Sequence, residues 1–367
     1  MNPVHVAILH AAPGAGAGPL ERLVAEARLE IADRHRARFM AAGASDAWVV
    51  AGPPDGRSFG GRLGTLLERL RTRTGSAFGV VVLGSGSVPL LRPADARRFV
   101  ETASGGDGAV LANNRYSADI VAIGRANELP AIDLLFSDNA LPRWLDERAG
   151  RIVRDLRDRP HLGFDVDSPL DLVLLGWGGA FAPEVVRRGR RVEGRLSALR
   201  DVASNPAAEL VVAGRTGSRA LALLERATAC RVRALVEERG LRAGSGHARP
   251  ARDQMQRRPR SLLGMVLDRH GPAAFGRVLA ELGDAALVDT RVLLAHRHGA
   301  DESAWPSAED RFASDLLDPE AIGDPWLREL TASACRAPIP IVLGGHSLVG
   351  PGLDLALRQR TPGGASR

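Results

Sequence analysis

Apolar runs and amphipathic stretches follow one another along the first half of the chain. The most informative run is 78–93, FGVVVLGSGSVPLLRP, in which Val80–Leu83 are continuously apolar. Such a run, bounded by Gly and Pro, is typical of a strand buried on both faces of a parallel sheet. The Gly84–Ser87 loop that follows would lie at the carboxyl end of this strand, where open α/β sheets bind their ligands.

The same pattern predicts the other elements of residues 1–203. Strands are expected at 4–12, 47–51, 109–113, 119–123 and 161–167, and helices at 20–42, 63–70, 93–100, 129–136, 141–157 and 181–203. Strands that alternate with helices are typical of a doubly wound, mostly parallel sheet. We therefore predict an α/β fold class for this part of the chain.

A second alternation begins after Ser204-Asn205-Pro206 and predicts a second α/β domain over residues 204–362. Its strands are expected at 209–213, 230–236, 285–295 and 339–344, and its helices at 218–227, 262–269 and 272–282. The polar, Arg-rich stretch 244–261 is interpreted as a mobile loop or an insertion. The predicted organisation is thus two domains, 1–203 and 204–362.

Composition narrows the possible functions. The chain has 367 residues, and its 45% hydrophobic and 25% charged content is that of a globular protein. All 49 basic residues are arginines because the sequence contains no lysine, which excludes Schiff-base and P-loop chemistry. Arg clusters at 187–200 and 250–260 suggest phosphate contacts with a nucleic acid. However, 43 acidic residues and 4% aromatics favour a solvated helix face and a mobile loop instead.

The cysteines and the N-terminal sequence favour a cytoplasmic protein. Cys230 and Cys335 fit neither a zinc motif nor a disulfide framework, as expected in a reducing compartment. The first 18 residues lack the positive region of a signal peptide. No stretch approaches the roughly 20 apolar residues that span a bilayer, so we expect no membrane partner.

Three motifs in the first half resemble the NTP-transferase fold of the molybdenum-cofactor guanylyltransferases and the 2-phospholactate guanylyltransferases. A first strand with a Gly-rich loop (6–18) stands where that family holds the nucleotide. The segment 79–91, GVVVLGSGSVPLL, resembles a strand that ends in an acid before Pro-Leu-Leu. The segment 164–172, FDVDSPLDL, resembles an Asp-x-Asp/Asn-Thr-Pro-x-Asp-Leu ending. This resemblance implies transfer of a nucleoside monophosphate from an NTP, GTP by analogy, to a small acidic or phosphorylated acceptor.

The resemblance also implies a set of site residues. Backbone N–H groups of Gly-rich turns and of a helix N-terminus would bind the phosphates. Mg²⁺ would be held by the carboxylates of Asp165 and Asp167, and Asp167 would also be catalytic. Asp119, at the start of a strand, is expected to replace a missing acid as a second catalytic residue. The expected nucleotide-binding residues are Ala12, Gly14, Gly16, Gly18, Gly84, Ser85, Gly86, Ser87, Asn113 and Asn114.

The chain departs from the family pattern at two points. Gly86 or Ser87 stands where the family has an acid, and the first loop, PGAGAGP, contains no basic residue. Arg28 or Arg62 is the candidate for the missing cation. A catalytically inactive nucleotide-binding or scaffold protein is therefore the alternative to a transferase. Asp167 has an alternative role as the N-cap of the helix that begins at Pro169, and 113–119 has one as an ordinary hairpin turn.

The second half carries polar groups at the ends of its expected strands, but its motifs match no family. The turn Gly214–Ser218 would suit an anion, whereas a helix cap by Ser218 is the alternative. Other polar sets with metal-binding or acid/base potential are Asp289–Arg291, His296 and His298, Glu309–Arg311 and Gly344–Ser347. Their alternative is capped loops and surface ion pairs.

Overall fold

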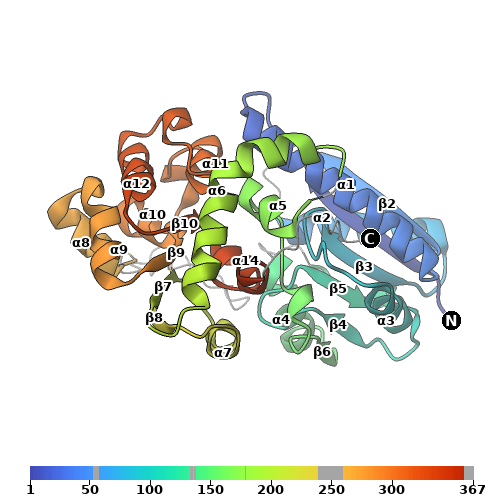
Figure 1. The fold of residues 1–367 in the computed structure, drawn as a ribbon. Coiled ribbons are helices and arrows are strands. Elements are labelled where there is room, and N and C mark those ends of the chain that lie inside the picture. The colour runs from blue at the N-terminus through green and yellow to red at the C-terminus, as the bar shows by residue number, and fades with distance from the viewer. Residues whose placement is uncertain (53–57, 133–134, 136–137, 178, 239–258, 359–367) are drawn as a thin grey trace. The chain divides into compact units, whose positions relative to one another are not determined.

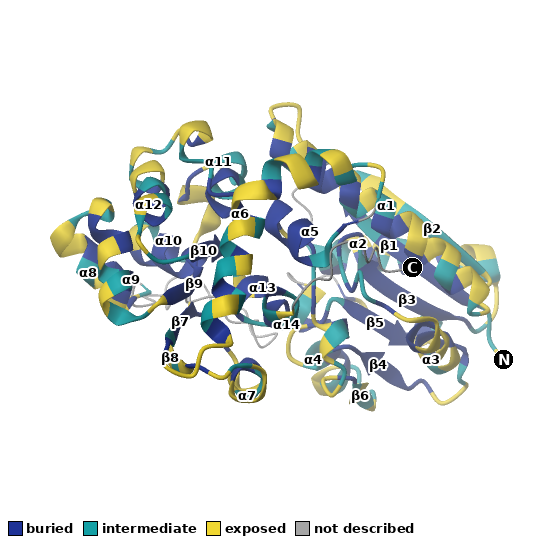
Figure 2. Ribbon diagram, viewed as in Figure 1, coloured by how far each residue is buried: buried dark blue, intermediate teal, exposed yellow. Residues whose placement is uncertain are grey.

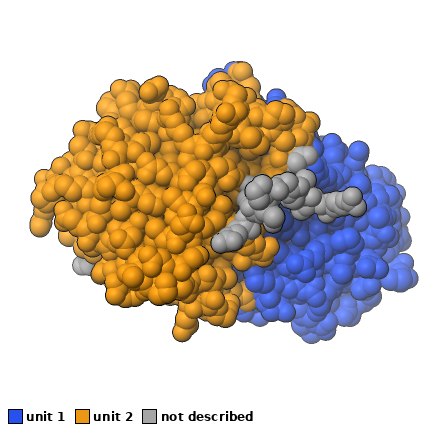
Figure 3. All heavy atoms as spheres, viewed as in Figure 1, with its two compact units in different colours: residues 1–16, 25–165, 242–255 blue, residues 17–24, 166–241, 256–367 orange. Residues whose placement is uncertain are grey.

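A computed structural model describes residues 1–52, 58–132, 135, 138–177, 179–238 and 259–358. These residues form two compact units, each with its own β-sheet (Figures 1 and 3). The first unit comprises 1–16 and 25–165, and the second comprises 17–24 and the described residues from Val166 onward. The helix expected at 181–203 is therefore part of the second unit.

The first unit contains a six-stranded sheet. Its order is β2-β1-β3-β5-β4-β6, in which β5 runs antiparallel to both neighbours and the other pairs are parallel. The strands are β1 (Val4–Ala11), β2 (Asp46–Gly52), β3 (Gly79–Gly84), β4 (Val110–Ala112), β5 (Ile120–Ile123) and β6 (Val153–Asp155). The sheet is thus mixed, because the β4–β5 hairpin inserts one reversed strand into a parallel arrangement.

Helices cover both faces of this sheet. Alternate residues of β3 point to opposite faces, so Val81 and Leu83 pack in one apolar cluster and Val80 and Val82 in another. The first cluster includes residues of α1 and α3, and the second includes residues of α2 and α4. Because both faces of β3 are buried, its apolar residues run without a polar interruption (Figure 2). The helices are α1 (Pro19–Ala41), α2 (Phe59–Thr74), α3 (Pro93–Ser104) and α4 (Leu141–Glu147).

The second unit contains a parallel sheet of order β10-β9-β7-β8. Its strands are β7 (Glu209–Gly214), β8 (Arg231–Val236), β9 (Ala285–Asp289) and β10 (Ile341–Gly344). From β7 the chain moves to β8 on one side and then to β9 on the other side of β7. The order of the strands therefore reverses between β7 and β9.

The helices of the second unit are short apart from α6, which is 22 residues long. They are α5 (Pro169–Leu175), α6 (Ala182–Ala203), α7 (Ser218–Ala227), α8 (Leu262–His270), α9 (Phe275–Leu282), α10 (Thr290–His298), α11 (Ala308–Asp315), α12 (Pro325–Arg336), α13 (His346–Val349) and α14 (Leu353–Leu357). None of the helices in the described part of the chain is long and apolar enough to cross a membrane. The structure as a whole confirms the predicted α/β class.

Three local predictions are wrong, each because tertiary contacts override the sequence pattern. The helix expected at 141–157 ends at Glu147, Gly150 adopts a left-handed φ of 62°, and β6 then pairs with β4. The strand expected at 161–167 is a 3₁₀ turn followed by one isolated bridge. The strand expected at 285–295 ends at Asp289, whose side chain caps α10.

Two other predicted segments have different outcomes. The helix expected at 129–136 is not formed in the described residues of that stretch. The loop expected at 244–261 lies outside the described residues except for its last three positions, where Ser261 caps α8.

The start of β3 packs closely against the end of α3. A Cβ at Gly79 would lie 1.9 Å from the carbonyl oxygen of Ala103, at the end of α3. We expect Gly79→Ala to destabilise the protein by about 3 kcal/mol, because backbone atoms have to move. Urea unfolding measures this difference. Gly106→Ala is the control, since nothing lies within 4 Å of its Cβ position, and an equal loss in both variants would contradict the prediction.

Candidate functional site

The Gly84–Ser87 loop is joined to the end of β1 by two hydrogen bonds. The Ser85 N–H donates to the carbonyl of Leu9 over 2.8 Å, and the Ser85 hydroxyl lies 3.0 Å from His10 Nδ1. His10 and Ser85 are both buried, at 8% and 5% exposure. Burial, followed by the charge of Arg28, lowers the pKa of His10. The imidazole is therefore neutral at pH 7 and able to share a proton with the hydroxyl.

The far end of the same loop is held by two further residues. His35, on α1, lies with its Nε2 2.8 Å from the carbonyl oxygen of Ser87. Because a carbonyl only accepts, Nε2 carries the proton of this ring. The Val88 N–H donates to Asp165 Oδ1 over 3.3 Å, and Ser87 and Asp165 form an isolated antiparallel bridge. The predicted residues of this loop and Asp165 are thus brought together.

Val88 adopts an unusual backbone conformation at the end of the loop. Its φ is 45°, although it is β-branched and fully buried. A side chain of this kind in the left-handed region costs on the order of 1–3 kcal/mol, and such strain is concentrated at functional sites. The contacts from His10, His35 and Asp165 hold the loop in this conformation. The strain therefore marks the loop as a candidate functional element.

Asn113, Asn114 and Asp119 lie in the β4–β5 hairpin beside this loop. The Asn113 side chain donates to Asp119 Oδ2 and to the Leu162 carbonyl, and accepts from the Asp119 and Ile120 N–H groups. The two donors and the oxygen of its amide are therefore engaged within the hairpin and by Leu162. Asn114 accepts from the Tyr116 N–H, which is a local turn contact. The Asp119 carbonyl accepts from the Gly84 N–H of the loop over 3.4 Å.

The predicted first loop has two different parts. Gly14 and Gly16 have open space around them, and Ala12 donates its N–H to Gly52. Gly18, in the second unit, adjoins the carboxylate of Glu309, which would lie 2.3 Å from a Cβ at that position. This carboxylate accepts from the N–H of Leu20 at 2.9 Å and of Glu21 at 3.1 Å. A phosphate at the start of α1 would therefore compete with Glu309.

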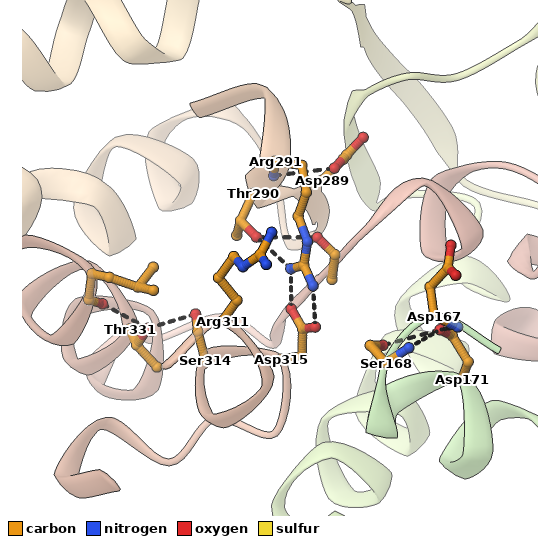
Figure 4. Close-up of polar contacts among 12 residues, drawn as sticks. Asp167, Ser168, Asp171, Asp289, Thr290, Arg291, Arg311, Ser314, Asp315 and Thr331 are labelled. Atoms are coloured by element: carbon orange, nitrogen blue, oxygen red, sulfur yellow. Dashed lines mark hydrogen bonds and ion pairs between the residues drawn. The ribbon is translucent and has the colours of Figure 1, made fainter. Parts of the chain in front are cut away.

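The segment after Asp165 is organised by a capping box. Ser168 is the N-cap of α5, and Asp171 accepts from the N–H groups of Asp167 and Ser168 at 2.9 and 2.7 Å (Figure 4). The helix cap is therefore Ser168, and Asp167 is left exposed. Burial and then the charge of Asp167 raise the pKa of Asp171 to about 7. Asp171 is a buried titratable group that the sequence reading did not single out.

A second set of polar groups lies at the carboxyl ends of β7, β9 and β10 in the second unit. Asp289, the last residue of β9, accepts two hydrogen bonds from Arg215, at 2.6 and 3.1 Å. Arg215 directly follows β7, so this ion pair joins the two strands between which the order reverses. The pair is close because Gly214 has a φ of 128° and no side chain, and a Cβ there would lie 2.3 Å from Asp289 Cβ.

A neighbouring ion pair is fully buried. Arg291 donates to both carboxylate oxygens of Asp315, and its second contact is 2.6 Å long (Figure 4). It also donates to Thr290 Oγ1, and Thr290 donates to the carbonyl of Gly344. Burial opposes both charges, but Asp315 keeps the pKa of Arg291 raised, so its guanidinium stays charged. These contacts connect the ends of β9 and β10.

His346 follows β10 and lies beside Arg215. Its Nδ1 is 3.0 Å from the Arg215 carbonyl oxygen, so Nδ1 carries a proton and donates. The residue is exposed, while one side of its ring packs against Gly350. This partial desolvation, followed by the charge of Arg215, lowers the pKa of His346. The neutral ring therefore presents Nε2 as a bare acceptor.

Sequence reasoning missed His10, His35, Asp171 and Asp315. It named Glu309 and Arg291 within polar sets, but it did not predict their partners, the start of α1 and Asp315. His10 carried a weak signal, since it lies near the carboxyl end of the first predicted strand, 4–12. The contact of Glu309 with α1 had no local signal, because 289 residues separate Glu309 from Leu20. Among the residues that the structure describes, no group of three or more His, Cys, Asp or Glu is placed to hold a metal ion.

The geometry defines an α/β protein with polar groups at the carboxyl edges of two separate sheets. Comparison with models of protein families finds no match, and comparison with curated proteins finds none either.

Burial of His35 predicts a pH dependence of stability. Burial lowers the pKa of His35 to about 4, against 6.5 when unfolded. Between these values the unfolded chain binds more protons, so stability falls as the pH drops from 6.5 toward 4. The loss from this group amounts to about 3 kcal/mol. Urea unfolding at pH 7.5 and 4.5 measures it.

The matched variant for this test is His35→Gln, which retains a donor for the Ser87 carbonyl and does not titrate. We expect it to reduce the pH dependence, with the remainder coming from His10 and from other groups. His270→Gln, at an exposed position at the end of α8, is the control and should leave the dependence unchanged. An unchanged dependence in His35→Gln would rule out His35 as its source.

Proposed function

We propose that the first unit binds a nucleoside triphosphate at the carboxyl edge of β1 and β3, and that the protein is a diverged nucleotidyltransferase. The observation that carries this proposal is the strained Gly84–Val88 loop. It is held by His10, His35 and Asp165, which come from three separate segments. A loop that is restrained in this way is pre-organised for a ligand.

The chemistry of the edge is consistent with a phosphate ligand. Small residues at Gly84 and Gly86 let the backbone approach phosphate oxygens closely. The charge of Arg28 acts on His10, which makes Arg28 the candidate for the cation that the chain has in place of a lysine. The motif resemblance of 79–91 and 164–172 to guanylyltransferases favours GTP as the nucleotide.

Mg²⁺ is the metal that such a reaction requires, and the donor set is compatible with it. Asp165 and Asp167 would hold the ion, since Mg²⁺ is commonly bound by one or two carboxylates together with substrate phosphates and water. When bound, the ion would neutralise charge on the phosphates. Asp167 is exposed, and Asp165 accepts from the Val88 N–H over 3.3 Å at the end of the restrained loop.

In the proposed reaction an oxygen of a small acidic or phosphorylated acceptor attacks the α-phosphorus of the nucleotide. A new P–O bond forms there, the bond to the bridging oxygen of the β-phosphate breaks, and pyrophosphate leaves. The Gly84–Ser87 backbone would hold the phosphates in line for this displacement. Asp119 stays our candidate for a further catalytic carboxylate, through its position beside Gly84.

A nucleotide-binding protein without transfer activity is the second candidate. Two observations favour it: the loop after β3 contains no acid, and Glu309 already takes the N–H groups at the start of α1. Nucleotide would then bind through the loop backbone alone, and Mg²⁺ would add little to its affinity.

Thermal unfolding with each NTP, with and without Mg²⁺, tests the proposal. A ligand at 100 times its Kd stabilises the folded state by about 2.7 kcal/mol, which raises the Tm by several degrees. We expect a shift with GTP that requires Mg²⁺ and is lost in Asp167→Asn. Asp201→Asn, at an exposed position on α6, is the control and should keep the shift.

The remaining outcomes separate the two candidates. A shift that is independent of Mg²⁺ and accompanied by no pyrophosphate release with any acceptor would favour the binding protein. The absence of a shift with all four nucleotides would overturn both.

A further inference from the structure

The second unit has features of a ligand site that the proposed function does not use. In parallel sheets, ligands bind outside the carboxyl ends of the strands, at the point where the strand order reverses. Here that point lies between β7 and β9, and the Arg215–Asp289 ion pair joins the two strand ends. The turn from β7 into α7 and the exposed His346 lie beside this pair.

The N-terminus of α7 is open to a ligand. Its N-cap is Gly217, which has no side chain to bond the first turn, and a Cβ there would meet nothing within 4 Å. The first intrahelical donor is Leu221, so the N–H groups of residues 218–220 lie outside the helical ladder. The first turn contains no acid and carries the exposed Arg219. Positive charge is unfavourable for a free helix N-terminus, whereas it favours a bound anion.

An independent observation comes from Thr216, the residue before this N-cap. Only 5% of Thr216 is exposed, and its hydroxyl has no hydrogen-bond partner among the described residues. Buried hydroxyls in folded proteins are normally paired. An unpaired one inside the turn indicates a position that a polar group from outside the chain completes.

His346 adds a group of opposite hydrogen-bonding character. Its Nδ1–H is engaged by the Arg215 carbonyl, which leaves Nε2 to accept from a ligand. Since Arg215 is two residues before Gly217, His346 lies close to the start of α7. A ligand that fits both positions carries an anion at one end and a hydroxyl donor at the other.

We propose that this edge of the second unit binds a small phosphorylated compound with a free hydroxyl group. Its phosphate is bound by the N–H groups at the start of α7 with Arg219, and its hydroxyl donates to His346 Nε2. The site goes beyond the proposed nucleotide site and does not depend on it, because all its residues belong to the second unit.

Modification of histidines with diethyl pyrocarbonate, followed by peptide mass spectrometry on the full chain, tests the site. Glycerol phosphate is the probe, and glycerol alone is its control. We expect glycerol phosphate to slow modification of His346 at least threefold and glycerol to have no effect. The exposed His270 is the internal reference, and its rate should not change. Equal rates at His346 with and without the probe would overturn the proposal.

Gly217→Asp distinguishes a specific site from a general effect. Its backbone is in the β region, with φ −93° and ψ 169°, so Asp fits there and its carboxylate would cap α7. We expect this variant to have a higher Tm than wild type and to lose the protection of His346. Gly217→Ala, which adds no carboxylate, should retain the protection. Protection of Gly217→Asp equal to that of wild type would overturn the assignment of the phosphate to α7.

The two proposals fail separately. A Tm shift with GTP but no protection of His346 from modification would support the nucleotide site and overturn the phosphate site at α7. Protection of His346 without a Tm shift with any nucleotide would support the site at α7 and overturn the nucleotide site.

Discussion

Parallel pairing of the strands decides where the polar groups of this protein lie. Parallel strands end at the same edge of a sheet, and the chain after each strand begins there with unpaired backbone groups. In the first unit the loop after β3 is held at this edge by His10, His35 and Asp165. In the second unit the residues after β7, β9 and β10 meet as ion pairs and a histidine. Both candidate sites are consequences of this one constraint.

The two edges balance charge in different ways. At the first edge both histidines are neutral, because burial lowers the pKa values of His10 and His35. The second uses complete ion pairs, in which Asp289 and Asp315 each face an arginine. A buried carboxylate without such a partner would be costly, and Asp171 shows the alternative, a pKa raised to about 7.

Local sequence predicted some parts of the candidate sites and failed at others. The loop after β3 was found because an apolar run followed by Gly and Ser residues is a local signal. The start of α5 at Pro169 was predicted, but its N-cap is Ser168, in a capping box with Asp171, and not Asp167. Asn113 is predicted to bind nucleotide, and the structure adds that its side chain makes four hydrogen bonds, to Asp119, Ile120 and Leu162. A pattern of residues does not reveal which bonds a side chain has already made.

The sequence by itself determined the α/β class, the order of most strands and helices, and the position of the Gly84–Ser87 loop. These follow from hydrophobic spacing and turn residues, which act over a few positions. Only the tertiary structure decided the antiparallel insertion of β5, the pairing of β6, the approach of Glu309 to α1 and the Arg–Asp pairs. Each of these joins segments that are distant in the chain, and their energies depend on burial and geometry that no local pattern contains.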